Sequence, residues 1–409
     1  MTRDARLLFL ARAVRMFGYG ALGVILVLYL ASLGFEAGQI GLLLTLTLVG
    51  DTLISLWLTT HADRIGRRRT LVLGAFLMAA AGAVFAAGPF DGSIGFAILL
   101  TAATIGVLSP SGSEVGPFLP IEQASLTEVT PGPRRTATYA WYNLVGSVAT
   151  ATGALAAGFA AGALQAAGWP AVDAYRAILA GYAVAALALV PVVWLVSADV
   201  EVPPVDTSIG RRLGLHRSQG VVARLASLFA LDAFGGGLII QSLLAFWFHE
   251  RFGLPAPVLG AIFFGANILA AVSALAAARI AARIGLINTM VFTHLPSNVL
   301  LMLVPLMPTV ELAIIVLLAR FSISQMDVPT RQSYTMAVVD PDERSAAAGI
   351  TGIARTTGAA LSPLIAAPLF AVPALAAVPF FLAGGLKIVY DLALWRAFRA
   401  RTPPEEAGR

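Results

Sequence analysis

The sequence predicts an all-α membrane protein in which twelve transmembrane helices form two pseudo-symmetric six-helix bundles. Three observations support this fold class. The first is composition: of the 409 residues, 58% are hydrophobic and only 12% are charged, and the mean hydropathy is +0.84. The second is a series of apolar runs long enough to cross a bilayer, and the third is an internal repeat that relates the two halves of the chain.

The composition also excludes several classes of protein. A soluble globular chain carries about twice this charged fraction and only about 45–50% apolar residues, so an ordinary soluble enzyme is excluded. The absence of cysteine excludes disulfides and thiolate metal sites. The formal net charge of +5 does not indicate a nucleic-acid partner, because the arginines lie between apolar runs and form no soluble basic face. We expect a monomer in the lipid bilayer, without cofactor or metal.

Twelve candidate spans result from cutting the sequence at clusters of charged, proline and glycine residues. A helix rises about 1.5 Å per residue, so about 20 apolar residues cross a hydrocarbon core of roughly 30 Å. A β-barrel is excluded, because its strands would alternate apolar and polar residues. The runs lie at about 7–33, 39–62, 70–88, 94–127, 137–164 and 173–197 in the first half, and at about 222–248, 255–283, 287–307, 310–338, 345–371 and 374–396 in the second.

Span four is unusually rich in helix breakers, with Pro110, Gly112, Gly116, Pro117 and Pro120 inside one apolar run. This density predicts a kinked or unwound helix. Broken backbone at membrane depth is tolerated where it lines a cavity or is covered by protein, so we expect this span to border a pathway.

The connections between spans predict the orientation. Alternate connections are rich in arginine, and by the positive-inside rule these are cytoplasmic, as are both termini. A bacterial-type inner (plasma) membrane is the expected location. The arginines concerned are Arg64, Arg67, Arg68, Arg69, Arg134, Arg135, Arg211, Arg212, Arg217, Arg396, Arg399, Arg401 and Arg409.

A polar stretch with Pro203-Pro204 and a basic cluster separates the two halves. It predicts an N-terminal bundle over 1–197, a cytoplasmic linker over 198–221 and a C-terminal bundle over 222–409.

The two halves repeat one another at an offset near 217–219 residues, which shortens to about 209 later. Five matches occur in the same order, which indicates duplication. Among them, Arg15-x-Phe17-Gly18-x-Gly20 matches Asp232-x-Phe234-Gly235-x-Gly237, Arg64-Ile65-Gly66 matches Arg283-Ile284-Gly285, and Pro120-x-Glu122-Gln123-Ala124 matches Pro329-x-Arg331-Gln332-Ser333.

The connection after span two resembles the loop motif of the major facilitator superfamily. It contains the core Asp63-Arg64-x-Gly66-Arg67-Arg68, although Thr59 stands where the family has a leading glycine. Together with the twelve spans and two halves, this resemblance covers the whole chain. It implies the fold of that superfamily, with parallel halves and a site between them at the midplane.

The same loop predicts a conformational latch of Asp63, Arg64, Gly66 and Arg67. A carboxylate that ends a helix at the membrane surface can pair with guanidinium groups or cap the next helix. Such a cluster can hold two helices in one conformation and release them in another. The alternative is that these arginines only set the topology.

Charges near the bilayer centre are the functional candidates, since each costs at least ~2.5–3.5 kcal/mol on insertion scales. They either pair across helices to hold the bundle together, or face a cavity and bind substrate or protons. We predict proton coupling at Asp51, Glu114 and Asp232, and substrate binding by Arg320, Arg355, Glu114, Asn143 and Gln241.

Two further charges have simpler interpretations. Arg15, also near mid-depth, can reach the interface by snorkelling. Lys387 and Asp391 are four residues apart and are expected to pair along their helix.

The resemblance implies a secondary active transporter that moves a small polar or charged solute by alternating access, and the buried carboxylates favour proton coupling. The partners are then a small-molecule substrate and protons. The alternatives are an energy-independent facilitator and a transporter-like receptor or sensor. The sequence contains no nucleotide-binding loop, serine nucleophile elbow or metal-ligand spacing, so we do not expect an enzyme.

Overall fold

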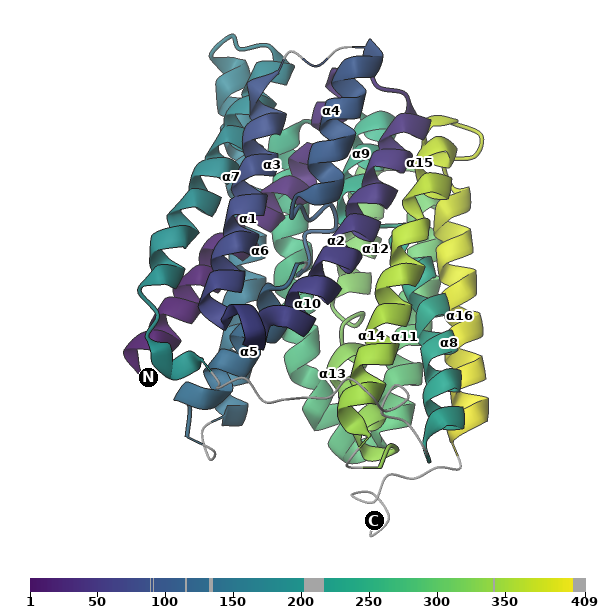
Figure 1. The fold of residues 1–409 in the computed structure, drawn as a ribbon. Coiled ribbons are helices and arrows are strands. Elements are labelled where there is room, and N and C mark those ends of the chain that lie inside the picture. The colour runs from purple at the N-terminus through teal and green to yellow at the C-terminus, as the bar shows by residue number, and fades with distance from the viewer. Residues whose placement is uncertain are drawn as a thin grey trace. The chain divides into compact units, whose positions relative to one another are not determined.

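The computed structural model describes residues 1–88, 90, 92–114, 116–131, 135–201, 217–340 and 343–399, without the side chains of Asp63, Thr136, Asp199 and Ser345. All regular structure in these residues is helical (Figure 1). Most of the predicted linker lies outside the described residues. So do five of the orienting arginines, which are Arg134, Arg211, Arg212, Arg401 and Arg409.

Ten helical stretches of the described chain are long and apolar enough to cross a membrane. The other two predicted spans are each built from two shorter helices. Span four consists of α4 (Gly92–Ile105) and α5 (Phe118–Val129), and span ten consists of α12 (Val310–Phe321) and α13 (Asp327–Ala337). The predicted break in span four is therefore confirmed.

The residues form two compact units, and the first comprises Met1–Thr207 and Ile240–Phe264. Within it, α1 packs against α6 and α7, α3 packs against α7, and α2 packs against α4. Its elements are α1 (Arg3–Ser32), α2 (Ala37–Ile65), α3 (Arg67–Ala87), α4, α5, α6 (Arg135–Ala166), α7 (Ala171–Trp194), η2 (Ala198–Val200), α9 (Gln241–Phe252) and the start of α10 (Ala256–Ile284).

The first unit includes Ile240–Phe264, although the second bundle was predicted to begin at residue 222. Backbone approach through small residues explains why this segment packs there. A Cβ atom on Gly158 would lie only 2.4 Å from the Ala256 carbonyl oxygen, and one on Gly162 would lie 2.3 Å from Pro257. The division at 1–197, 198–221 and 222–409 stays a prediction.

The second unit comprises Ser208–Ile239 and Gly265–Arg409. Within it, α8 packs against α14 and α16, and α11 packs against α12, α13 and α16. Its elements are α8 (Gln219–Gly237), the rest of α10, α11 (Leu286–Leu303), η4 (Val304–Leu306), α12, α13, α14 (Arg344–Leu361), α15 (Pro363–Ala371) and α16 (Val378–Phe398).

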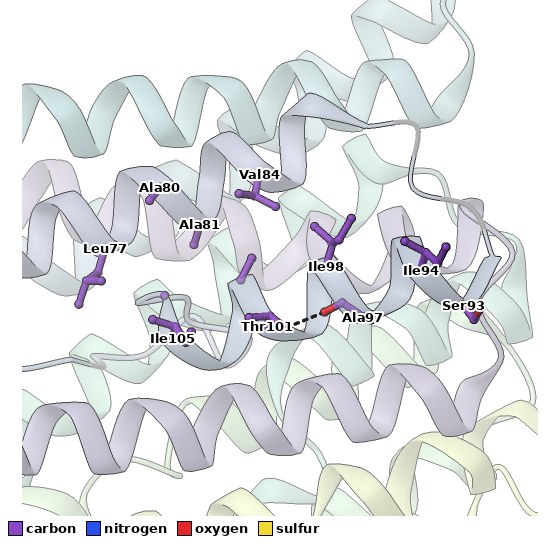
Figure 2. Close-up of a pocket in the computed structure, with 12 residues that line it drawn as sticks. Leu77, Ala80, Ala81, Val84, Ser93, Ile94, Ala97, Ile98, Thr101 and Ile105 are labelled. Carbon is purple, nitrogen blue, oxygen red and sulfur yellow. Dashed lines mark hydrogen bonds between the residues drawn. The ribbon is translucent and has the colours of Figure 1, made fainter.

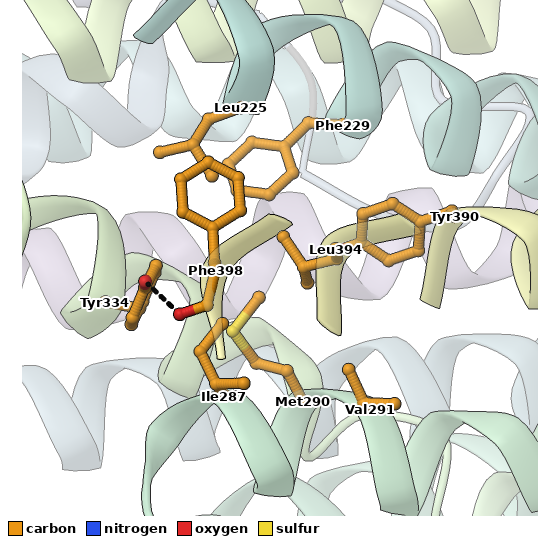
Figure 3. Close-up of a cluster of buried hydrophobic side chains, with 9 residues drawn as sticks. All are labelled: Leu225, Phe229, Ile287, Met290, Val291, Tyr334, Tyr390, Leu394 and Phe398. Carbon is orange, nitrogen blue, oxygen red and sulfur yellow. Dashed lines mark hydrogen bonds between the residues drawn. The ribbon is translucent and has the colours of Figure 1, made fainter. Parts of the chain in front are cut away.

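A buried apolar cluster joins four helices of this unit, α8, α11, α13 and α16. Figure 3 shows the rings of Phe229, Tyr390 and Phe398 around it, and the Tyr334 hydroxyl donates to the Phe398 carbonyl at 3.5 Å. The cluster contains Leu225, Phe229, Ile287, Met290, Val291, Tyr334, Tyr390, Leu394 and Phe398. It fixes the helices that carry the charged groups described below.

Glycines that match in the repeat allow two helices to approach closely in each unit. A Cβ atom on Gly20 of α1 would lie 2.0 Å from the Thr150 carbonyl oxygen of α6. A Cβ atom on Gly237 of α8 would lie 2.4 Å from the Ala359 carbonyl oxygen of α14. Both positions require glycine because the backbones of two helices meet there, so the repeat found in the sequence also relates helix contacts.

Candidate functional site

A group of buried charged side chains lies in the first unit, and we call it the first charge cluster. Arg15 on α1 forms a bidentate ion pair with Glu122 on α5, with two N–O distances of 2.7 Å, and both side chains are fully buried. Glu114, in the break of span four, accepts from Arg15 Nε at 3.0 Å and from Arg12 Nη1 at 2.7 Å. The Tyr142 hydroxyl of α6 donates to Glu122.

The cluster is charge-matched within itself. Two arginines face two carboxylates, and the guanidinium groups of Arg12 and Arg15 also lie over the rings of Tyr142 and Phe118, at 4.2 and 4.3 Å. Bidentate geometry and complete hydrogen bonding are what a buried ion pair needs to offset its desolvation. Arg15 therefore does not snorkel, and that interpretation was wrong.

Asp51 on α2 differs from the carboxylates of this cluster. It is buried, no ion pair joins it to any cation in the described part of the chain, and its Oδ1 atom has no hydrogen-bond partner there. Glu114 lies close enough to interact with it electrostatically.

The two polar amides predicted for substrate binding lie in different surroundings. Gln241 on α9 packs against α1 and the span-four break, since a Cβ atom on Gly23 would lie 2.6 Å from its Nε2 atom and one on Gly112 would lie 3.1 Å from its Oε1 atom. Asn143 on α6 is exposed, and its carbonyl oxygen accepts from Ser147. The structure does not bring Asn143 into the first charge cluster.

The second charge cluster lies in the second unit and centres on Asp232 of α8. Its Oδ1 atom accepts from Lys387 Nζ of α16 at 2.6 Å. Its Oδ2 atom accepts from Arg331 of α13 and Arg355 of α14, both at 3.3 Å. Arg331 also pairs with Asp327 at 2.7 Å. The Arg355 side chain is 34% exposed, which makes it the most accessible cation of this cluster.

A second carboxylate of this cluster is held by polar groups of α11. His294 Nδ1 lies 2.9 Å from Asp391 Oδ1, and Asn298 Nδ2 donates to Asp391 Oδ2 at 3.1 Å. The predicted pairing of Lys387 with Asp391 along α16 was therefore wrong. Lys387 pairs instead with Asp232 on α8. Among the described residues, no other cation lies within 3 Å of the Asp232 Oδ1 atom.

Arg320 at the end of α12 stands apart from these pairs. It is 7% exposed, and no hydrogen bond or ion pair joins its side chain to another residue that the structure describes. Its guanidinium lies 4.9 Å from the Phe321 ring, and it interacts electrostatically with Asp327 and Asp232.

A family model described as Major Facilitator Superfamily matches residues 8–363. The chain belongs to the Major Facilitator Superfamily. The predicted superfamily and the predicted all-α fold of twelve spans are confirmed, and the chain is a multi-pass membrane protein.

Individual members of the superfamily show how far the likeness extends. The uncharacterized membrane protein YJR124C of Saccharomyces cerevisiae is 29% identical over 394 residues, which cover 89% of this chain and 87% of that protein. Crystal structures of a variant of the nucleoside transporter NupG and of a D-xylose-proton symporter both superpose with a TM-score of 0.75. They are 12% and 14% identical, and the matches cover 97% and 99% of this chain and 100% and 99% of theirs. At these identities the solved structures show the fold alone.

The superfamily loop motif is bonded to η2 and to Glu201, the residue that follows it. Gly66, between α2 and α3, has a φ of +101°, which favours glycine. The Glu201 carboxylate accepts from the backbone N–H groups of Arg67 and Arg68 at 2.7 and 3.1 Å, and so caps α3. Arg67 is buried and donates to the Val200 carbonyl at 3.1 Å, whereas Arg64 is exposed. The Asp63 side chain lies outside the described residues, and the latch stays a prediction.

Several members of the two clusters were not predicted as site residues. Arg12, His294, Asp327, Arg331 and Lys387 are the principal ones. A pattern could have found Arg12, because it lies three residues before Arg15 and so on the same helix face. No comparable pattern marks the pairing of His294, because its partners come from α8 and α16.

A separate apolar pocket of about 660 Å³ lies between α3 and α4 (Figure 2). It contains none of the predicted site residues and no charged side chain. Its only polar side chains are Ser93 and Thr101, and the Thr101 hydroxyl donates to the Ala97 carbonyl at 2.8 Å. Ile94 at its rim is 77% exposed. In a multi-pass membrane protein such a face suits contact with lipid chains, so we place the functional site in the charge clusters.

Proposed function

We propose that this superfamily member is a secondary active transporter that moves a small charged solute by alternating access and is driven by protons. It is a transporter and not an enzyme. The observation that carries the proposal is the charge balance of the two charge clusters, counted together with Asp51 and Arg320. In the first unit, Asp51 is added to two arginines and two carboxylates, so a bound proton makes that set neutral.

The second charge cluster, counted together with Arg320, has the opposite balance. It contains one more cation than carboxylates while His294 is neutral, and the cation without a pair among the described residues is Arg320. A substrate with a carboxylate or phosphate group would make this set neutral, and the planar guanidinium suits such a group. The cations are Arg320, Arg331, Arg355 and Lys387, and the carboxylates are Asp232, Asp327 and Asp391. Glu343, another buried carboxylate of this unit, lies outside the cluster and accepts from the backbone N–H groups of Arg217 and Ser218.

Transport is tested in two steps. Purified protein is first screened by thermal shift against D-xylose, uridine and a panel of small organic anions. We expect an organic anion to raise the melting temperature. That compound is then used in proteoliposomes, where an inward proton gradient should drive its accumulation above the external concentration. Accumulation that ignores the gradient would favour a facilitator, and binding without flux would favour a receptor.

Proton coupling is assigned by conservative variants in the same liposomes. Asp51→Asn should abolish gradient-driven accumulation while exchange of substrate across the membrane continues, because the neutral amide can carry no proton. Glu114→Gln and Asp232→Asn are compared with it, and Asp173→Asn, at a half-exposed carboxylate of α7, is the control. Full coupling in all three variants would refute the proton assignment.

The Arg320 proposal predicts a strong preference for arginine. Arg320→Lys should weaken binding of the organic anion by about tenfold, or roughly 1.4 kcal/mol, because an ammonium lacks the two-pronged geometry. Arg279→Lys, at an exposed position of α10, is the matched control. Unchanged affinity in Arg320→Lys would mean that Arg320 has a structural role.

We also propose a plasma-membrane location, which is the inner membrane in a bacterial cell, with both termini cytoplasmic. The distribution of arginines between alternate connections supports this orientation. Tags at the two termini should be accessible to protease only from the cytoplasmic side.

A further inference from the structure

His294 occupies a position between two carboxylates on different helices. It is 4% exposed, and its Nδ1 atom lies 2.9 Å from Asp391 Oδ1 of α16. On the opposite side of the ring, Nε2 lies 4.0 Å from Asp232 Oδ1 of α8. Each ring nitrogen therefore faces an acid, and histidine is the side chain whose charge changes most readily near neutral pH.

The same oxygen of Asp232 is already occupied by an ammonium group. Lys387 Nζ lies 2.6 Å from Asp232 Oδ1, which is the oxygen that His294 Nε2 faces. Lys387 Nζ from α16 and His294 Nε2 from α11 thus face the same oxygen of Asp232.

The charge of Asp391 decides which nitrogen of the neutral ring bears the proton. When Asp391 is ionised its carboxylate can only accept, so Nδ1 is the donor to it and does not accept from Asn298 Nδ2, which lies 3.3 Å away. Nε2 then has a lone pair that points toward the Asp232 carboxylate and cannot bond to it. In this state Lys387 holds Asp232 alone on that side.

We propose that His294 and Asp391 form a proton-binding pair, and that a proton bound at His294 Nε2 draws Asp232 away from Lys387. The added proton makes Nε2 a charged donor that can bond to Asp232 Oδ1, in competition with Lys387 Nζ. The only covalent bond that breaks is the one between the proton and the acid that delivers it. Proton uptake thus shifts a contact of α8 from α16 to α11.

Other charged and titratable groups in the second unit act on the same centre. Arg331 and Arg355 hold the second oxygen of Asp232, and the Tyr390 ring stands edge-on to His294 with centroids 6.1 Å apart. The positive groups oppose a charge on His294 and the acids favour it. The full set is Asp232 on α8, Arg320 on α12, Asp327, Arg331 and Tyr334 on α13, Arg355 on α14, and Lys387, Tyr390 and Asp391 on α16.

The pair also gives a reason for linkage between proton and solute, and this step rests on the proposed function. A proton on His294 adds a positive charge to the second charge cluster, in which the cations, counted with Arg320, already outnumber the carboxylates by one. An anionic solute is then bound more tightly with the proton than without it, and by reciprocity the proton is bound more tightly with the solute.

The composition of the chain permits a direct test without any substrate. It contains four histidines and one lysine, which is Lys387. Full-length protein in lipid nanodiscs, labelled with ¹⁵N at histidine or at lysine, can be followed by NMR between about pH 5 and 9. The His294 signal is identified by its loss in His294→Gln.

We expect His294 to change from a ring protonated at Nδ1 to an imidazolium within this range. The single Lys387 side-chain signal should shift with the same midpoint. In His294→Gln the Lys387 signal should lose its pH dependence. The control is His249→Gln on α9, where His249 Nδ1 lies 2.8 Å from the Leu254 carbonyl oxygen, and this variant should leave the pH dependence intact.

A His294 ring that stays neutral throughout, in wild-type protein, would overturn the proposal. A Lys387 signal that titrates equally in wild type and in His294→Gln would overturn the competition for Asp232. Because the first readout uses wild-type protein, a misfolded variant does not decide whether His294 binds a proton. Titration of the pair without proton-driven flux would refute the proposed coupling while leaving the proton site in place.

Discussion

Arg15 and Glu122 form a fully buried ion pair. Their two 2.7 Å contacts satisfy both oxygens of the carboxylate and two nitrogens of the guanidinium. In an apolar interior, loss of one partner leaves an uncompensated charge, whereas loss of both leaves none. The contribution of the pair to stability therefore depends on how it is removed.

This difference gives a testable prediction at the residue scale. Arg15→Gln or Glu122→Gln should each lower the free energy of unfolding by about 3–5 kcal/mol. The double variant should be more stable than either single variant, because Arg12 still neutralises Glu114. Thermal unfolding in detergent measures the cycle, and Arg6→Gln at the exposed start of α1 is the control. Additive losses would contradict it.

The ion-pair partners of individual charged residues could not be predicted from the sequence. Asp232 and Lys387 lie in apolar runs of the sequence, which predicts that they are buried, and both are buried. Their partners were not correctly predicted, since a pairing within α16 and one between α16 and α8 differ only in how the helices are rotated. Packing of apolar residues such as Phe229 and Tyr390 sets that rotation.

At the scale of elements, helix breaks were more predictable than helix contacts. Proline and glycine remove backbone donors or stabilising side chains locally, so the run from Pro110 to Pro120 revealed its break. Span ten has a break between Phe321 and Asp327 with no proline inside it, and only its match to span four in the repeat hinted at the interruption.

Glycines at helix crossings supply a prediction for these elements. Gly20→Ala and Gly237→Ala should each cost about 1–3 kcal/mol of stability, because the new methyl group would meet a carbonyl oxygen of the neighbouring helix. Gly181→Ala and Gly385→Ala, in helices where a Cβ atom meets nothing within 4 Å, should be neutral or slightly stabilising. The melting temperatures of the four variants test this prediction, and equal shifts in all four would refute it.

At the scale of the whole molecule, the two units contain an ion pair at matching positions, with the charges exchanged. Arg15 matches Asp232 in the repeat, and Glu122 matches Arg331, so each unit joins its first helix to the second half of its broken span by an ion pair. The pairing of helices is retained, while the sign at each position is exchanged. The repeat was visible in sequence, but the shared ion pair required the structure.

This exchange of sign constrains the history of the chain. After duplication both copies held the same pair, and a single substitution in one copy would have set two like charges against each other in an apolar interior. Such a state is strongly destabilising, because it leaves uncompensated buried charge. Reversal by way of an uncharged pair avoids this state, and the double variant at Arg15 and Glu122 would reproduce such an intermediate.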